Sequence, residues 1–238
     1  MKKVLALVVF DAFSFSATLY SNAAAQTATM NDGFDSYPAE QWAEGSTQGN
    51  WHVGFNGYGS VGITQPSRKN PNKVHYQKPL AATSPGETHS SMVVSTPVYN
   101  GVDYTVSLRT VKQLRTGSAP NPWEVAWVVW GYSDYLHFYY FVPKPNGIEL
   151  GKVHPSYPGG QRFLRTSNTP QAAVGSWHTV RVRQAGSVID VWLNGTPVVS
   201  GLRDDPGPAG EAHYASGRVG MYNEDAHVHF DDVRVAST

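Results

Sequence analysis

The chain has 238 residues, with 18 basic and 18 acidic side chains and a formal net charge of zero. This balance excludes a global charge that would draw the protein to nucleic acid or to an anionic membrane surface. Only 15% of the residues are charged while Gly, Pro, Tyr and Trp are frequent, a composition that favours a turn-rich β protein over a helical or disordered one.

The first segment has the pattern of a secretory signal peptide. Lys2 and Lys3 precede an apolar run, and three alanines at positions 23–25 offer a small-residue cleavage site. We expect residues 1–25 to be removed and the protein to be secreted or periplasmic. The alternative is an uncleaved N-terminal anchor, but the run is short and contains Asp11. No other stretch approaches membrane-spanning length, so we expect no membrane partner after cleavage.

The remaining chain, residues 26–238, is predicted to form one domain. It contains no cysteine and no internal repeat. An exported domain without disulfides must bury a sizeable apolar core, and a chain of this length can do so. We expect a monomer.

Short β-type runs separated by Gly, Pro, Asn and Asp fill this part of the chain, as is typical of a sandwich. The predicted strands lie within residues 90–99, 103–111, 123–132, 135–142, 147–153, 162–166, 177–186, 188–198, 217–223 and 226–235. Val180 and Val182 face one side of their strand while Arg181 and Arg183 face the other. Asn-Gly at 194–195 predicts a two-residue hairpin. The fold class is therefore all-β, with two packed antiparallel sheets.

Three of these segments resemble a known superfamily. "GSWHTVRVRQAGSVIDVWLNGTPV" (175–198) and "ASGRVGMYNEDAHVHFDDVRV" (215–235) are similar to the closing half of concanavalin A-like lectin/glucanase jelly rolls, including LamG-like modules. "YLHFYYFVPKPNGIELGKV" (135–153) is similar to their central hairpin. The resemblance extends from Asp32 to Val235 and implies a β-sandwich jelly roll. It does not specify function, because the superfamily includes lectins, glycoside hydrolases and polysaccharide lyases.

A structural calcium ion is also implied by this resemblance. Along the last predicted strand the apolar residues have even numbers up to 230 and odd numbers from 233, so the pleat must slip at Asp231 and Asp232. Such a slip is a β-bulge, which can aim carboxylates at a hard cation. Asp35 matches the acidic residue of the N-terminal segment that related folds place against the last strand. The alternative is that Asp231 and Asp232 are solvated charges at a strand end.

Several familiar catalytic patterns are missing from the sequence. We find neither the E-x-D-x-x-E strand of family 16 glycoside hydrolases nor a G-x-S-x-G elbow, and zinc-ligand spacing is absent. His227 and His229 share one face of a strand, which is more typical of a polar row than of a metal pair. A cross-strand pair of Glu124 and Glu149 leaves hydrolysis open as a weaker alternative.

The aromatic strand at 136–142 is the main candidate for ligand contact. We predict that its even-numbered residues, from Leu136 to Val142, face the core, and that His137, Tyr139 and Phe141 line an open groove. Aromatic rings in such a groove supply flat surfaces for sugar rings. Further predicted substrate contacts are Trp123, Glu124, Trp127, Trp130, Lys144, Glu149 and Gln161.

Basic residues follow this strand, which favours an acidic, uronate-containing polysaccharide. Its β-elimination needs a base, an acid and a group that stabilises the enolate. We assign His137 and Tyr139 to proton transfer, and Lys152 and Arg162, with Gln161, to the enolate. The leading hypothesis is therefore a secreted polysaccharide lyase. The rival is a non-catalytic carbohydrate-binding or lectin-like protein, and a hydrolase using Glu124 and Glu149 is the third alternative.

Overall fold

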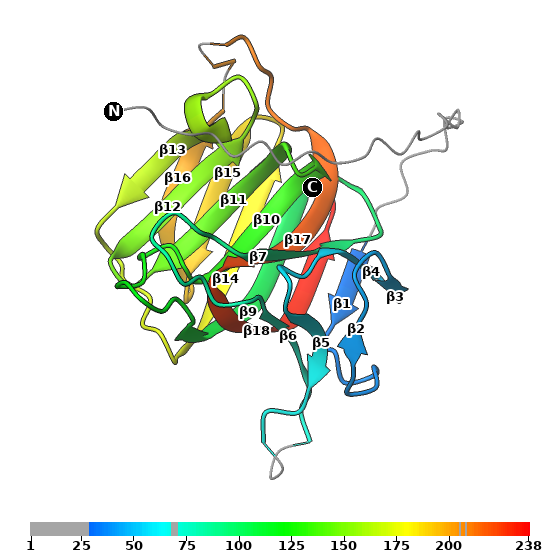
Figure 1. Ribbon diagram of the computed structural model, residues 1–238. Helices are drawn as coiled ribbons and strands as arrows, with labels where there is room; N and C mark the ends of the chain where they lie inside the picture. The colour runs from blue at the N-terminus through cyan, green and yellow to red at the C-terminus, as the bar shows by residue number, and fades with distance from the viewer. Residues whose placement is uncertain (1–28, 68–70, 205, 208) are drawn as a thin grey trace, which may run out of the picture.

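The computed structural model describes residues 29–67, 71–204, 206–207 and 209–238. The predicted signal peptide lies outside these residues. Within them the chain forms two antiparallel sheets that pack face to face, so the predicted all-β sandwich is confirmed (Figure 1). A single 3-10 turn, η1 (Pro158–Gly160), is the only helical element in the described part of the chain.

Each sheet is described here in spatial order. Sheet A consists of β16 (Thr196–Arg203), β15 (Val188–Leu193), β14 (Trp177–Ala185), β9 (Val102–Gln113), β18 (Ala226–Ala236), β6 (Val74–Lys78), β5 (Ser60–Thr64) and β2 (Gln41–Trp42), with β1 (Thr29–Asp32) paired to β18. Sheet B consists of β13 (Gln161–Ser167), β12 (Gly147–Val153), β11 (His137–Lys144), β10 (Ala126–Asp134), β17 (Ser216–Glu224), β7 (Ser90–Ser95), β4 (Trp51–Phe55) and β3 (Thr47–Gln48), with β8 (Tyr99–Asn100) paired to β17.

The core between the sheets follows from period-two alternation. On β9 the even-numbered residues from Val102 to Leu108 are buried and their odd-numbered neighbours are half-exposed. Val180 and Val182 are buried while Arg181 and Arg183 are exposed, as predicted. The chain reverses between β15 and β16 with positive φ at both residues of the Asn-Gly dipeptide, 52° and 78°. This is the predicted two-residue hairpin.

The first strands of the chain contribute to both sheets. β6 lies next to β18 in sheet A, and β4 lies next to β7 in sheet B (Figure 1). Sequence reasoning missed the strands between residues 41 and 78, because they are short and interrupted by glycine. Trp51 of β4 is fully buried, and its indole N–H donates a 2.9 Å hydrogen bond to Asp32.

The predicted β-bulge lies in the last strand. Opposite β9, the pairing of β18 shifts between Asp231 and Arg234, and Asp232 has a φ of 51°. The shift lets Phe230 and Val233 both point into the core although their positions differ by three. Both aspartates are thereby left on the outer side of sheet A.

None of the helices found among the described residues has the length and apolar character needed to cross a membrane.

Candidate functional site

The direction of the side chains on β11 is the reverse of the predicted one. Tyr139 and Phe141 belong to the core between the sheets, whereas Phe138, Tyr140 and Val142 belong to a separate cluster on the outer face of sheet B. Both sets of side chains are buried, because β11 is apolar on both faces. Such a strand shows no alternation of polar and apolar residues, so its sequence does not indicate which face points into the core. The even-numbered side chains therefore form the surface on which a ligand of sheet B would lie.

The outer aromatic cluster of sheet B is built from six strands and the segment before β10. Its members are Met92, Val94, Val125, Trp127, Val129, Phe138, Tyr140 and Val142, with Phe55, Tyr132, Val153 and Tyr222 packed at its margin. The Trp127 ring centroid lies 5.0 Å from that of Tyr140 and 5.0 Å from that of Tyr222. Trp127, predicted as a substrate contact, is therefore on the outer face.

Gly151 makes room for the Tyr140 ring. The two residues are partners in the β11–β12 register, and a Cβ at Gly151 would lie only 2.2 Å from the Tyr140 hydroxyl oxygen. On the far side of Gly151, the register places Phe163 of β13, whose side chain is 58% exposed. Phe163 was not predicted as a site residue. The signal for it was the pair of adjacent apolar residues, Phe163 and Leu164, in an edge strand whose other residues are polar: only Leu164 packs against the core, so Phe163 faces outward.

Glu224 is the most strongly perturbed carboxyl group on this face. It shares the outer side of β17 with Tyr222, whose hydroxyl donates a 2.8 Å hydrogen bond to it. Burial raises the pKa of Glu224 from 4.5 to about 7, against the lowering effect of the Tyr222 hydrogen bond. The negative charges of Asp225, Glu124 and Glu149 raise this pKa further. Sequence reasoning did not select Glu224, because one strand residue gives no sign of the neighbouring strands' charges.

The other carboxylates near this face have cationic partners. Lys144 donates a 2.7 Å hydrogen bond to Glu149, and both side chains are largely buried. Arg115 binds Glu124 at 2.6 Å and Asp225 at 3.0 Å. Among the described residues, Glu224 has no such ion pair. Two carboxyl groups on one face, one ion-paired and one with a raised pKa, are an arrangement suited to proton transfer.

Two polar atoms on this face lack a hydrogen-bond partner among the described residues. They are the hydroxyl of Tyr140 and one carboxylate oxygen, Oε2, of Glu124. Burial and the charge of Glu149 raise the pKa of Tyr140, so its hydroxyl remains a donor at neutral pH. Both atoms are buried, so neither is exposed to a ligand in this conformation.

Three predicted catalytic residues come together, but inside the protein. Tyr139 and Lys152 are fully buried, and both bind the Asp204 carboxylate, Lys152 at 2.8 Å. Arg162 donates to Asp204 and to Glu211, each at 2.9 Å. Each cation is thus tied to a carboxylate, so the assignment of these residues to proton transfer and enolate stabilisation is not supported by their positions.

This buried ion network instead holds Asp204, Glu211 and Ala212 against sheet B. Lys152 also donates to the backbone carbonyl of Ala212 at 2.7 Å, and its ammonium lies 4.6 Å from the centroid of the Tyr214 ring. Burial, with the hydrogen bond to Asp204, raises the pKa of Tyr139, which keeps the phenol protonated as a donor. The sequence separation of 52 residues between Lys152 and Asp204 hid this role.

The remaining predicted site residues are dispersed. The His137 ring nitrogen Nδ1 lies 2.8 Å from Asp134, the last residue of β10. Trp130 is a core residue whose indole donates to Gln184 at 2.7 Å, so its predicted substrate contact is wrong. Trp123 is 42% exposed at the end of sheet B near Trp127. Gln161 begins the edge strand β13 and pairs with Val153.

The three predicted calcium ligands lie in one region without forming a complete set. Asp35 accepts the backbone N–H of Lys73 at 2.8 Å, and Asp231 accepts Asn72 at 2.8 Å. Among the described residues, no group of three or more His, Cys, Asp or Glu side chains is arranged to hold a metal ion. Burial raises the pKa of Asp231, and the charges of Asp232 and Asp35 add to this effect. A calcium ion that binds here must therefore take further ligands from backbone carbonyls or water.

Chelation tests this calcium site. If calcium binds at Asp35, Asp231 and Asp232, removing it with EDTA is expected to lower the melting temperature by several degrees, because a ligand that binds only the folded state stabilises it. Re-addition of calcium, but not of magnesium, is expected to restore the value. An unchanged melting curve in EDTA would remove the calcium prediction.

Solved structures with the same fold are distantly related in sequence. The chain is similar to the carbohydrate-binding module CBM66 from Bacillus subtilis, with 12% identity, a TM-score of 0.53 and coverage of 79% of this chain and 96% of that one. It is also similar to a protein with a galectin-like fold from Bacillus subtilis, with 10% identity, a TM-score of 0.54 and coverage of 79% and 89%. These similarities confirm the concanavalin A-like fold implied by the sequence.

A third structure was solved in work on endo-acting O-glycanases of the human gut microbiota. It is 12% identical, with a TM-score of 0.54 and coverage of 88% of this chain and 98% of that one. A search of curated protein sequences found no match to this chain. Residues 89–236, more than half of the chain, match the family described as the 3-keto-alpha-glucoside-1,2-lyase-like domain. The chain therefore belongs to the 3-keto-alpha-glucoside-1,2-lyase-like family.

Proposed function

We propose that this protein binds a carbohydrate on the outer face of sheet B and catalyses a 1,2-elimination from a 3-keto-α-glucoside. The family name supports the type of substrate and bond. The observation that carries the proposal is the Glu224 carboxyl group, with a pKa of about 7, on the same aromatic face as the ion-paired Glu149. These two groups meet the chemical demands of an elimination.

The reaction needs one base and one acid. The ketone at C3 makes the C2–H bond acidic, so a base removes that proton and the electron pair is delocalised onto the C3 oxygen. The electron pair then returns to form the C1=C2 double bond, and the C1–O bond to the leaving group breaks. An acid supplies a proton to the departing oxygen. The products are an unsaturated 3-keto sugar and a free alcohol.

We assign these roles to the two glutamates. Glu149, paired with Lys144, acts as the carboxylate base. Glu224 is close to half-protonated at neutral pH and acts as the acid that protonates the leaving oxygen. Trp127, Tyr222 and Phe163 supply the aromatic surface for the sugar ring.

Uronate specificity is not retained in this proposal. It depended on Lys152 and Arg162 facing an open groove, and both are bound to Asp204. A C3 ketone replaces the uronate carboxylate as the group that acidifies the neighbouring proton. Elimination as a type of reaction is therefore kept, while the acidic polysaccharide is not.

The product of the reaction tests this function. The purified protein is incubated with methyl 3-keto-α-glucoside, with unoxidised methyl α-glucoside and with a uronate polymer. We expect ultraviolet absorbance of a conjugated enone only from the keto sugar, because elimination places the C1=C2 bond next to the C3 ketone. Release of 3-keto-glucose without the enone would indicate hydrolysis instead, and absorbance from the uronate polymer would restore the acidic substrate.

A carbohydrate-binding protein without catalysis is the second candidate. It is favoured by the similarity of the fold to the carbohydrate-binding module CBM66. Val129, Tyr140 and Val142 are each 0% exposed, so such a ligand would lie at the margin of the aromatic cluster. In that case the protein would bind α-glucosides and leave every substrate unchanged. Calorimetric binding of methyl α-glucoside, combined with unchanged substrates in the assay above, distinguishes this function from the enzymatic one.

The proposed cellular location follows from the N-terminal sequence alone. We keep the prediction that residues 1–25 direct export and that the protein works outside the cytoplasm as a monomer.

A further inference from the structure

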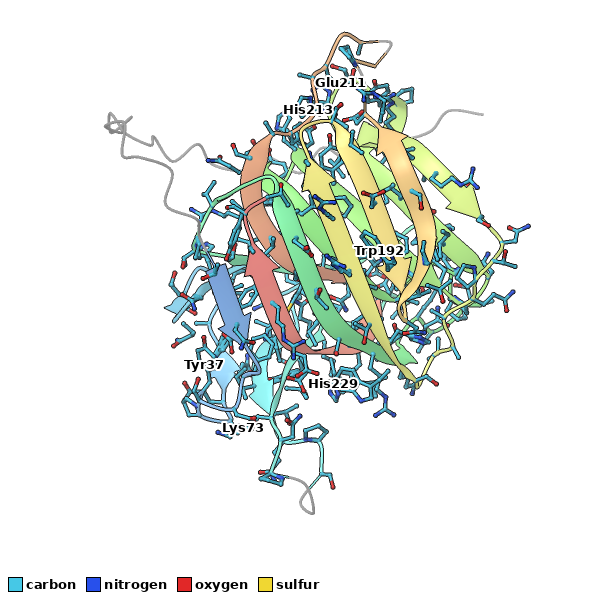
Figure 2. The ribbon with its side chains drawn as sticks, turned by 180° about the vertical axis from the view of Figure 1, so that it is seen from behind. Tyr37, Lys73, Trp192, Glu211, His213 and His229 are labelled. Carbon is cyan, nitrogen blue, oxygen red and sulfur yellow. The ribbon has the colours of Figure 1, made fainter. Side chains whose placement is uncertain are left out.

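A cavity lies on the other side of the sandwich from the proposed catalytic face. It has a volume of about 330 Å³, and its lining includes Asn72, Val74, Ser107, Trp177, Asp231 and Asp232. These residues come from β6, β9, β14 and β18 of sheet A and from the segment before β6. Figure 2 views this sheet from its outer side, with His229 of β18 near the end where the cavity lies and Trp192 nearer the middle.

The sheet register brings the lining residues together. Ser107 of β9 is the partner of Asp231 on β18, and Trp177 of β14 is the partner of Arg109, one outward position further along β9. The bulge in β18 turns both Asp231 and Asp232 to this side. The cavity is therefore fixed by regular strands and does not depend on loop conformation alone.

The polar part of the lining includes the carboxylate oxygens of Asp231 and Asp232, which can accept further hydrogen bonds. Asp231, only 7% exposed, accepts Asn72 at 2.8 Å on one oxygen and the backbone N–H of Asp232 at 2.7 Å on the other. Ser107 donates to Asp232 at 3.2 Å. Each carboxylate oxygen can accept a second hydrogen bond, and neither aspartate has an ion pair with any described residue.

The apolar part of the lining is a tryptophan ring. Trp177 is 42% exposed, and its centroid lies 6.4 Å from that of the His229 imidazole, which supports it from one side. His229 is itself 6% exposed, and its Nδ1 has no partner among the described residues. A large aromatic ring held in place but left open to solvent is a surface on which a flat ligand can stack.

From these features we infer a second carbohydrate-binding site, which takes a single pyranose unit. The volume is at the lower end for ligand pockets, so it suits one sugar ring rather than a chain. An aromatic wall opposite carboxylates matches the apolar face and the hydroxyl donors of a sugar. Within the described part of the chain the two aspartates have no ion pair, so their charge disfavours phosphate and uronate as occupants. The site is independent of the elimination proposed at sheet B.

The site is tested by following the tryptophan indole N–H signals of ¹⁵N-labelled protein by NMR, in EDTA. Methyl α-glucoside is the probe, and the Trp177 signal is assigned from its loss in Trp177→Phe. We expect this signal to shift with a saturable curve. Trp177→Ala is expected to weaken binding at this site, followed through the Ser107 amide signal, by roughly tenfold or more.

Two control variants make the test specific. Trp192→Ala removes an aromatic ring from the same outer face, where Trp192 packs 4.9 Å from the Arg181 guanidinium, and is expected to leave the affinity unchanged. Glu224→Gln changes the proposed catalytic face of sheet B and is also expected to leave the sugar affinity of the Trp177 site unchanged. Asp232→Asn keeps the side-chain shape and is expected to weaken binding.

The following results would overturn the inference. An unshifted Trp177 signal at saturating sugar would do so, as would equal losses in Trp177→Ala and Trp192→Ala. Binding that appears only after calcium is added would replace direct sugar contact by a metal-mediated one. A response to tetramethylammonium but not to the glucoside would identify the cavity as a site for cations.

Discussion

Replacing Glu224 with glutamine is expected to lower the rate of 3-keto-α-glucoside elimination by about 10²- to 10⁴-fold, the usual contribution of a general acid. Glutamine keeps the size of the side chain and can still accept the Tyr222 hydrogen bond, but it has no proton to give. The measurement is kcat from the enone absorbance. Substrate affinity is expected to change little, because the lost function acts in the chemical step.

The pH dependence gives a second readout of the same residue. An acid must be protonated to work, so wild-type kcat is expected to fall as pH rises through about 7, the pKa of Glu224. The Tyr222 hydrogen bond lowers this pKa, so Tyr222→Phe is expected to move the falling limb to higher pH. A limb that stays in place in Tyr222→Phe would contradict the assignment of the acid.

Glu224→Gln should also change stability with a defined sign. The pKa of Glu224 is 4.5 in its ordinary state and about 7 in the folded protein, so between these values the unfolded chain loses the proton first. Wild-type stability contributed by this group therefore falls as pH rises from 4.5 to about 7. Glutamine does not titrate, so the variant does not lose stability in this way. The difference in free energy of unfolding between Glu224→Gln and wild type is expected to rise between pH 4.5 and about 7 and to stay constant above that.

Two variants serve as controls for the loss of activity. Glu40→Gln changes an exposed glutamate far from sheet B and is expected to keep full turnover. Tyr139→Phe removes a hydroxyl that lies inside the buried network, so it too should keep measurable turnover once folded. Loss of activity in Tyr139→Phe equal to that of Glu224→Gln would favour the original assignment of Tyr139 to proton transfer.

Removing Asp204 is expected to cause the largest loss of stability. Asp204→Ala leaves the Lys152 ammonium, which is 0% exposed, without its nearest counter-ion at 2.8 Å. Leaving a buried charge without its partner typically costs about 3–5 kcal/mol of the free energy of unfolding. Denaturation in urea measures this value. The variant is also expected to release residues 209–214, detected as faster proteolysis in that segment.

An exposed ion pair supplies the control for this stability measurement. Arg181 and Asp103 are joined at 2.6 Å on the outer face of sheet A, where solvent screens the pair. Asp103→Ala is expected to cost less than about 1 kcal/mol. The double variant Lys152→Met with Asp204→Leu is expected to recover part of the loss, because it removes the buried charge as well as its partner. A loss below 1 kcal/mol in Asp204→Ala would show that Lys152 finds other compensation.

The fold was more accessible from sequence than the site. Strands such as β14 and the hairpin after β15 combine alternating polarity with an Asn-Gly turn, and both were predicted correctly. The bulge at Asp231 was predictable because the apolar residues on either side change parity. The short strands β2 to β6 were not, because two to five residues give too little alternation to distinguish a strand from a loop.

The candidate site depended on facts that one strand does not contain. β11 is apolar on both faces, so its sequence does not say which face meets the other sheet. Asp204, which binds Tyr139 and Lys152, is 65 and 52 residues away from them. The raised pKa of Glu224 results from burial and from carboxylates on other segments. Composition pointed to aromatic and ionisable groups in one region, but only the three-dimensional register showed which of them share a surface.

The N-terminal strands pair with strands of both sheets, and this limits where the chain can be truncated. The family match covers residues 89–236, and it omits β6 beside β18 and β4 beside β7. A fragment that begins at residue 89 would lack the partners on one side of β18 and of β7. Each of these interior strands would then become an edge strand with unpaired backbone groups on that side. Such open edges invite aggregation. The start of an expression fragment or a fusion boundary therefore has to lie before Thr29, since the region that matches the family is smaller than the unit that folds.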